Sequence, residues 1–228
     1  MNSCSAAWPC ACASRTTRIF FVQKLSHAEL LERQSAKRER AGRLPFAVVL
    51  NNIRSLHNVG SIFRTADGAG VEKIFLCGIT GIPPHAKISK TALGAEKNVA
   101  WEYGETARGC TKKLKAEGYQ VVLLEQTKKS IPYERFRPRP PVALVLGNEI
   151  TGVAEDLLAL CDQAIEIEMT GLKISLNVTA AFAVAAYHIR SVITSSSAIE
   201  SAAGTSPSEG RLPARRQEGI RPKIFGGQ

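Results

Sequence analysis

Several patterns that define common protein classes are missing from this sequence of 228 residues. No stretch approaches the roughly 18 uninterrupted apolar residues that a membrane-spanning helix requires, so we expect no membrane partner. The six cysteines are scattered, without a CxxC pair or a cluster of Cys with His. That scatter disfavours a zinc site, and we predict no metal. Isolated cysteines are typical of small buried side chains in a reducing compartment, which predicts a cytoplasmic protein.

The motifs of common nucleotide-binding and hydrolytic enzymes are also missing. There is no GxxxxGK[ST] loop, no GxGxxG follows the first expected strand, and no GxSxG is present. These absences argue against a P-loop nucleotidase, a Rossmann-type dehydrogenase or methyltransferase, and a hydrolase with a serine elbow. Acidic pairs occur at 155–156 and at Glu166 with Glu168, but they lie at an expected helix start and on an expected strand. A glycosidase-like pair is therefore disfavoured.

Positive charge is in excess, with a formal net charge of +10. Such a surplus points to a polyanionic partner, most often a nucleic acid. Residues 1–43 carry eight Lys and Arg against three Glu, residues 195–228 carry five against three, and the middle carries 17 against 14. The surplus therefore lies mostly in the two flanks. Residues 1–28 contain no Asp or Glu, which fits an organelle transit peptide, a plain extension or a misassigned start.

Strand and helix patterns alternate in the middle of the chain. Short apolar runs predict buried strands at 44–50, 71–77, 98–103, 119–126, 141–147 and 163–169. Helices are expected at 55–70, 106–118, 152–161 and 177–193, and Gly- and Pro-rich loops at 78–97 and 130–141. This alternation predicts an α/β fold with a mainly parallel sheet covered by helices on both faces.

The chain divides into three expected parts. Residues 1–43 form a basic N-terminal extension with a helix at about 27–41, which opens with a capping box at Ser26 and Glu29. Residues 44–194 form one domain. Residues 195–228 are rich in Ser, Gly, Ala, Pro and Arg, and we expect this tail to be disordered.

Arg64 stands on the polar side of one expected helix. On helical spacing it points away from an apolar stripe, which consists of Val59, Ile62, Phe63, Ala66 and Ala69. Gly60, Ser61 and Gly68 lie about one turn from Arg64, where a solvated face more usually carries longer polar side chains. The small neighbours predict free space around this cation.

Polar residues follow three of the expected strands, at 51–64, 147–149 and 169–177. Because ligands bind beyond the carboxyl ends of strands in such sheets, these segments are candidates for one shared site. Ordinary loop chemistry is the alternative. The last helix is rich in Ala, which predicts a close approach of another segment to its backbone, and either Ser175 or Asn177 could cap it.

Taken together, "NNIRSLHNVGSIFRTADGAG", "LVLGNEITGV" and "IEMTGLKISLNVTAA" resemble the three motifs of the SpoU/TrmH family of RNA ribose 2'-O-methyltransferases, within the SPOUT superfamily. The resemblance covers about residues 46–193. It implies a SPOUT-type fold with a C-terminal trefoil knot, S-adenosylmethionine as methyl donor, tRNA or rRNA as substrate, and a homodimer whose active site is completed across the interface. One departure is Glu168, which stands where the family usually has Pro.

The resemblance also implies roles for individual residues. The candidate catalytic residues are Asn58, Arg64, Glu149, Ser175 and Asn177. The candidate cofactor-binding residues are Gly147, Ile167, Met169 and Leu176. For Asn58 the plainer alternative is a helix N-cap, and for Glu149 it is a solvated acid in a turn. A guanidinium is a poor general base because its pKa exceeds about 12, so we favour Arg64 as a clamp on a substrate phosphate, with clearance for ribose at its small neighbours.

RNA contacts outside the motifs are expected on two basic segments, although a solvated charged face is the alternative. Their residues are Arg33, Lys37, Arg38, Arg40 and Arg43 in the extension, and Lys87, Lys90 and Lys97 in the long loop. Two other functions stay open beside ribose methylation. One is a non-catalytic RNA-binding homologue, and the other is methylation of a base nitrogen by the same fold.

Overall fold

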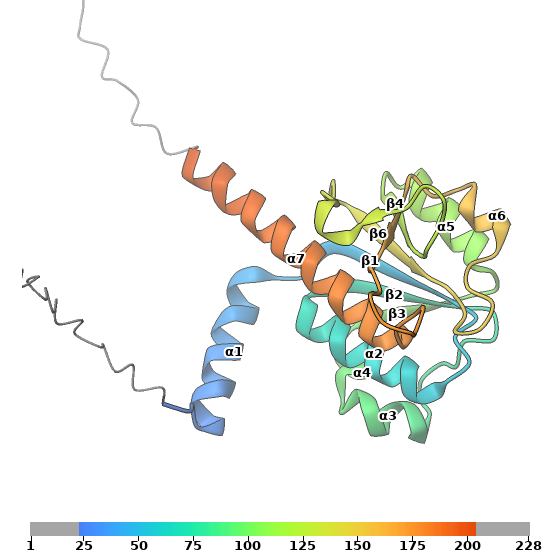
Figure 1. Ribbon diagram of the computed structural model, residues 1–228. Coiled ribbons are helices and arrows are strands. Elements are labelled where there is room, and N and C mark those ends of the chain that lie inside the picture. Colours follow the sequence, from blue (N-terminus) through green and yellow to red (C-terminus); the bar gives the residue numbers. More distant parts are fainter. Residues whose placement is uncertain (1–22, 204–228) are drawn as a thin grey trace, which may run out of the picture. The chain divides into compact units, whose positions relative to one another are not determined.

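The computed structural model describes residues 23–203 (Figure 1). Its contacts divide the chain at Gly42 into two units. The first contains α1 (His27–Ala41), whose start is held by a reciprocal pair of hydrogen bonds between Ser26 and Glu29. The second unit, which begins at Arg43, contains the sheet and the remaining elements.

A sheet of seven strands organises the second unit, in the order β3-β2-β1-β6-β4-β7-β5. All of its pairings are parallel, which confirms the predicted α/β class. The strands are β1 (Leu44–Asn51), β2 (Val71–Cys77), β3 (Ala100–Gly104), β4 (Gln120–Leu124), β5 (Ile131–Pro132), β6 (Val142–Leu146) and β7 (Gln163–Glu166). The two central strands β1 and β6 are apolar and almost wholly buried, as expected for a sheet covered on both faces.

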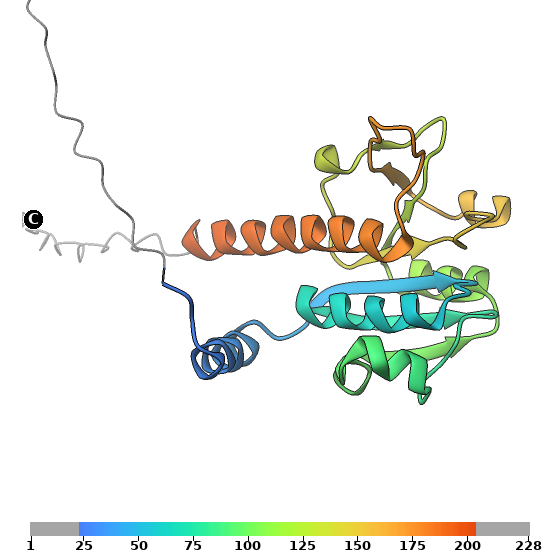
Figure 2. The same cartoon turned by 60° about the horizontal axis from the view of Figure 1, so that its bottom comes forward.

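Helices cover both faces of this sheet (Figures 1 and 2). They are α2 (Leu56–Ala69), α3 (Ala86–Ala92), α4 (Ala95–Asn98), α5 (Ala107–Ala116), α6 (Glu155–Leu158) and α7 (Val178–Ala203). Because side chains alternate along a strand, β1 sends Phe46, Val48 and Leu50 to one core and Ala47 and Val49 to the other. The first core also contains side chains of α2, α3, α4 and α7, and the second contains those of α5 and α6.

Two segments expected to be loops contain regular structure. The segment 78–97 forms α3 and α4, because His85 caps α3 through its side chain and Ile88 and Ala92 are buried apolar side chains of this helix. The segment 130–141 contributes the edge strand β5 and a 3₁₀ turn at Tyr133–Arg135. Gly and Pro content predicted loops in both places, but tertiary burial stabilises short elements that propensity alone would not.

The last helix is longer than the expected 177–193, because α7 continues to Ala203 and so into the expected tail. Hydroxyl groups after Ile193 donate to backbone carbonyls one turn earlier, from Ser195 to Ser191 at 2.8 Å and from Ser196 to Val192 at 3.0 Å. These bonds satisfy the polar side chains within the helix, so Ser does not end it. The rest of the expected tail lies outside the described residues, as does most of the transit-like segment 1–28, of which residues 23–28 are described.

The C-terminal trefoil knot stays a prediction. Among the described helices, none is both long and apolar enough to cross a membrane.

Candidate functional site

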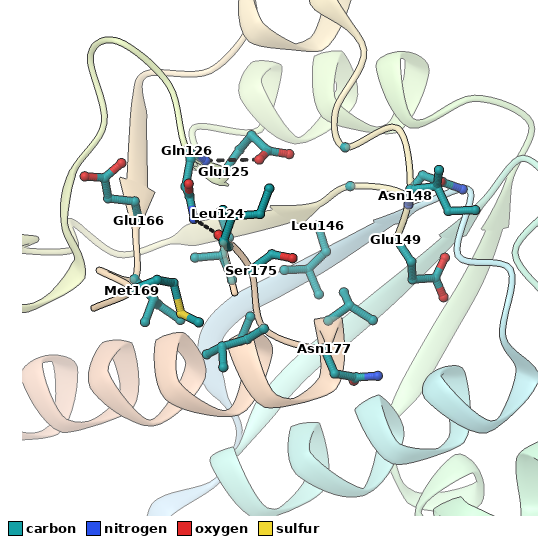
Figure 3. Close-up of a pocket in the computed structure, with 18 residues that line it drawn as sticks. Leu124, Glu125, Gln126, Leu146, Asn148, Glu149, Glu166, Met169, Ser175 and Asn177 are labelled. Atoms are coloured by element: carbon teal, nitrogen blue, oxygen red, sulfur yellow. Dashed lines mark hydrogen bonds between the residues drawn. The ribbon is translucent and has the colours of Figure 1, made fainter. Parts of the chain in front are cut away.

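A cavity of about 580 Å³ lies at the carboxyl ends of β4, β6 and β7, beside the start of α7 (Figure 3). Its volume is in the range of small-molecule sites. It is lined by Leu124, Glu125, Gln126, Leu146, Gly147, Asn148, Glu149, Ile150, Gly152, Glu166, Ile167, Met169, Ile174, Ser175, Leu176, Asn177, Val178 and Ala181. Residues of the second and third sequence motifs therefore meet around one space.

The loop after β6 is a tight turn that needs glycine. Asn148 and Gly152 exchange two backbone hydrogen bonds of 3.0 Å. A Cβ on Gly147 would lie 2.6 Å from the carbonyl carbon of Gly152, too close for any other residue. The Asn148 side chain accepts hydrogen bonds from the N–H groups of Ile150 and Thr151, and donates one to the carbonyl of Asn52 at 2.7 Å. The turn is thus closed internally and tied to the end of β1.

Glu149 joins this turn to the start of α2. Its carboxylate accepts hydrogen bonds from the N–H of Arg54 at 3.0 Å, the N–H of Ser55 at 3.3 Å and the side-chain amide of Asn58 at 3.0 Å. Burial by itself raises the pKa of the Glu149 carboxyl, but these hydrogen bonds outweigh it and hold the pKa below its ordinary value. Glu149 is therefore an exposed acid whose carboxylate is held in place by three hydrogen bonds.

Asn58 connects all three motifs. Its Nδ2 donates to Glu149, and its Oδ1 accepts from Nδ2 of Asn177 at 3.5 Å. Asn58 is not the N-cap of α2, because Ser55 holds that position and accepts from the Asn58 N–H. Asn177 also accepts the N–H of Thr179 at the start of α7. The hydrogen bonds between Glu149 and Asn58 and between Asn58 and Asn177 therefore link the first turn of α2 to the start of α7.

Most of the predicted site residues lie at this cavity. Gly147, Ile167, Met169 and Leu176, predicted to bind the cofactor, all line it, as do the predicted catalytic residues Glu149, Ser175 and Asn177. Asn58 does not line the cavity, but its side chain donates a hydrogen bond to the lining residue Glu149. The sequence motifs therefore predicted residues that the fold brings to one place, although their chemical roles stay predictions.

Arg64 is the exception, because it does not line the cavity. It is exposed on α2, and no residue of the described part of the chain hydrogen-bonds to its guanidinium. Its small neighbours do not make free space for a ligand. A Cβ on Gly60 would lie 2.3 Å from the carbonyl of Ile88 in α3, and one on Gly68 would lie 2.8 Å from the hydroxyl of Tyr187 in α7. The small residues of α2 let two neighbouring helices approach it.

Three polar lining residues were missed by the sequence analysis. Glu125 and Gln126 directly follow β4, and Glu166 ends β7. Gln126 donates to the carbonyl of Ile174 at 2.7 Å, which ties the end of β4 to the third motif (Figure 3). Ser130 donates to Glu166 at 2.5 Å. The expected strand at 119–126 included both Glu125 and Gln126, whereas the apolar run and the strand end at Leu124, and the end of that run was the available signal.

The cavity is suited to a cationic ligand. Three of its described lining residues are the carboxylates Glu125, Glu149 and Glu166, and none is Lys, Arg or His. Apolar side chains such as Ile167, Met169 and Leu176 provide the rest of its wall. In the described part of the chain, no group of three or more His, Cys, Asp or Glu could hold a metal ion.

The residues predicted to contact RNA lie in different surroundings. Arg33 and Lys37 are exposed on α1, and Lys87, Lys90 and Lys97 are exposed on α3 and α4. Arg38 and Arg40 belong to α1, but their side chains lie outside the described residues. Arg43 belongs to the second unit, where it forms an ion pair of 2.8 Å with Asp67 and donates to the carbonyl of Asn98. It holds the end of α2 to the end of α4.

Known proteins share the sequence and fold of the second unit. The tRNA (guanosine(18)-2'-O)-methyltransferase of Escherichia coli is 29% identical over 143 residues, which are 61% of this chain and 60% of that protein. The protein of the same name from Thermus thermophilus is 31% identical over 159 residues, 67% of this chain and 81% of that protein. A solved AdoMet-bound rRNA methyltransferase from Sinorhizobium meliloti superposes with a TM-score of 0.61 at 27% identity, covering 64% of this chain and 56% of that one.

The chain spans about 60% of the length of its Escherichia coli relative. Residues 45–187 match the model of the SpoU rRNA Methylase family. This match covers more than half of the chain and includes all three polar segments that meet at the cavity and its rim. The chain therefore belongs to the SpoU rRNA Methylase family.

Proposed function

We propose that the chain is an RNA methyltransferase that transfers a methyl group from S-adenosylmethionine to a ribose 2'-hydroxyl of tRNA or rRNA. The observation that carries this proposal is the joining of the three family motifs at one acidic cavity through Glu149, Asn58 and Asn177. The names of the relatives, which are tRNA and rRNA methyltransferases, support it.

The cavity residues fit the proposed cofactor. S-adenosylmethionine supplies a methyl group on a positively charged sulfur, and a wall with carboxylates and no basic side chain among its described residues favours such a cation. Ile167, Met169 and Leu176 would contact the apolar surface of the cofactor. The tight turn at Gly147 would place backbone N–H and C=O groups of that turn beside the cofactor.

The residues around the cavity mainly orient the reactants. Aligning two reacting groups can supply about 7–11 kcal/mol of the barrier. Glu149 and Asn58 fix the turn after β6 against α2, and Ser175 and Asn177 line the side from which a ribose would approach. Arg64 clamps the phosphate next to the target ribose in a bidentate contact and stabilises the developing alkoxide, while that phosphate accepts the hydroxyl proton.

We also infer a homodimer in which Arg64 of one copy serves the cavity of the other. Arg64 is exposed and outside the cavity of its own chain. Large apolar side chains near the cavity are exposed, with relative exposures of 73% for Ile150, 102% for Leu172 and 81% for Ile174. Such exposed apolar side chains are typical of an interaction surface.

The dimer is tested by mixing two inactive variants. Arg64→Ala keeps the cavity intact, and Met169→Arg places a cation in the cavity while keeping Arg64. If Arg64 acts across the interface, a mixture of the two refolded together regains activity in proportion to the mixed dimers, each of which has one complete site. No recovery, or a monomer by light scattering, contradicts the shared site.

Ribose methylation is tested with labelled S-adenosylmethionine and total tRNA or rRNA. We expect label in alkali-resistant dinucleotides, because a 2'-O-methyl group blocks cleavage of the following phosphodiester. Label in alkali-sensitive nucleotides instead indicates methylation of a base nitrogen. RNA binding without cofactor binding in calorimetry indicates a non-catalytic homologue. We place this activity in the cytoplasm, a proposal supported by the three free cysteines of the described residues.

A further inference from the structure

The segment between β4 and β6 carries a concentration of positive charge that the three motifs do not include. Residues 44–194 hold 17 Lys and Arg against 14 Asp and Glu, and residues 128–139 account for five of the former and one of the latter. The five basic residues are Lys128, Lys129, Arg135, Arg137 and Arg139. Without this segment the body would be slightly acidic.

These basic side chains are free to meet a partner. All five residues are exposed, and none forms an ion pair with a described residue. Arg137 donates to the backbone carbonyls of Glu134 and Phe136, which fixes its guanidinium without neutralising it. By contrast, Lys113 and Lys115 on α5 are paired with Glu102 and Asp162.

The backbone that presents these charges is firmly held. β5 pairs with β7, and Phe136 is buried, with its carbonyl 2.9 Å from Nε2 of His188 in α7. The Tyr133 ring meets the edge of the His188 ring. Thr127 and Ser130 close the turn that carries Lys128 and Lys129 through hydrogen bonds of 3.0 and 2.8 Å. Because the backbone is already ordered, less conformational entropy is lost when the charged side chains bind a partner.

The basic segment starts at the wall of the cavity. Gln126, two residues before Lys128, lines the cavity and donates to the carbonyl of Ile174 (Figure 3). Ser130 donates to the lining residue Glu166. The cavity itself has carboxylates and no basic side chain among its described residues. The cavity is therefore acidic, and the chain that leaves it after β4 is basic.

We propose that the near part of this segment, residues 128–135, binds the phosphate backbone of the substrate RNA on the side of the cavity formed by β4 and β7. The far part leads away from the cavity, because the N–H of Arg139 donates to Gln120 at the start of β4. This inference rests on the proposed function for the identity of the polyanion. An RNA whose ribose reaches the cavity must continue along its rim, and fixed Lys and Arg side chains there would bind its phosphates.

The test compares two charge reversals of equal size. Lys128→Glu with Arg135→Glu changes the segment, and Arg108→Glu with Lys112→Glu makes the same change in net charge on α5, which packs on the other face of the sheet. Binding of a fluorescent tRNA transcript and of a fluorescent rRNA stem-loop is measured by anisotropy over a series of KCl concentrations.

We expect the segment variant to lose about tenfold or more in affinity and to reduce the salt slope by about 1.5, because two phosphate contacts are lost. The α5 variant should lose less and keep the slope. The conservative pair Lys128→Arg with Arg135→Lys should bind like wild type, which controls for folding. Cofactor binding by calorimetry should be equal in all of them, and the KM for RNA should rise with little change in kcat.

Equal affinities and equal salt slopes in the two reversed variants overturn the inference, as does wild-type protein that binds neither RNA. If wild type binds RNA but does not methylate it, and the segment variant alone loses affinity, the proposed function fails while the inference on RNA binding stands.

Discussion

Asn58 has two hydrogen-bonding groups on its side chain, and each is used by a different motif. Its amide satisfies a fixed carboxylate, and its carbonyl oxygen receives the Asn177 amide. Single residues of this kind determine how three distant segments are aligned. The predictions at the residue scale therefore concern hydrogen-bond geometry more than net charge.

Replacing Arg64 by Lys is expected to remove most of the methyl transfer, although the positive charge is kept. Lys cannot form the planar two-donor contact with a phosphate that a guanidinium forms. Steady-state rates with saturating cofactor test this, and calorimetry should show normal cofactor binding because Arg64 lies outside the cavity. Near-normal turnover by the Lys variant would show that charge alone is sufficient.

Replacing Glu149 by Gln is expected to lower stability by about 1 kcal/mol at pH 7, since hydrogen bonds to a charged group contribute about 1.5–3 kcal/mol and solvent weakens exposed ones. The folded pKa of Glu149 lies below its unfolded value. Its contribution is therefore complete above the unfolded pKa of about 4.3 and is lost as the pH falls through the folded pKa.

Urea unfolding of both proteins between pH 7 and pH 3 measures this difference. The gap between wild type and Glu149→Gln should shrink in the acidic part of the series. Glu105→Gln serves as a control, because Glu105 is exposed and has no hydrogen bond to a described residue. A gap that stays constant with pH contradicts the assignment.

At the scale of elements, α2 is the central helix of its layer. It contacts α3 on one side and α7 on another, and its own Gly60 and Gly68 allow both approaches. The sequence showed that small residues surround Arg64, but it did not show which neighbouring helix packs against them. The close approach of α3 explains Gly60, whereas Gly68 faces only the end of the Tyr187 side chain.

Gly60→Ala and Gly68→Ala form a matched pair. A Cβ on Gly60 would lie 2.1 Å from Oγ1 of Thr91 and 2.3 Å from a backbone carbonyl, so we expect a loss of about 1–3 kcal/mol in the free energy of unfolding. A Cβ on Gly68 meets only the hydroxyl end of Tyr187, which can move. That variant should be neutral or gain up to about 1 kcal/mol from helix propensity. Equal losses in thermal unfolding would contradict this account.

At the scale of the molecule, the two units differ in how far their side chains are buried. The second unit contains both hydrophobic cores and the cavity, whereas α1 is exposed along its described side chains. The described side chains of α1 therefore take no part in either core, and we predict that its basic residues contact RNA.

Deletion of residues 1–42 should leave the second unit folded, with unchanged cofactor binding. RNA affinity should fall, and the dependence of affinity on salt should become less steep, because phosphate contacts are removed. Titration of RNA at several salt concentrations measures both effects. Unchanged affinity would show that the charged face of α1 is only solvated.

The sequence by itself determined the α/β class, the buried central strands and the set of motif residues at the cavity. Apolar runs such as residues 46–50 encode burial directly, and the resemblance of the three motifs to a known family identifies the site residues without the fold. The short helix α3 and the edge strand β5 were not predictable, because burial against other elements stabilises them and their own propensity does not.

Only the tertiary structure decided which partners surround each residue. It showed that Gly60 and Gly68 make room for helices, that Arg43 holds α2 to α4, and that Arg64 lies away from its own cavity. It also brought Glu125 and Glu166 to the cavity from strands that are neighbours in the sheet but distant in sequence. Distances between segments depend on packing, and no local pattern of residues contains them.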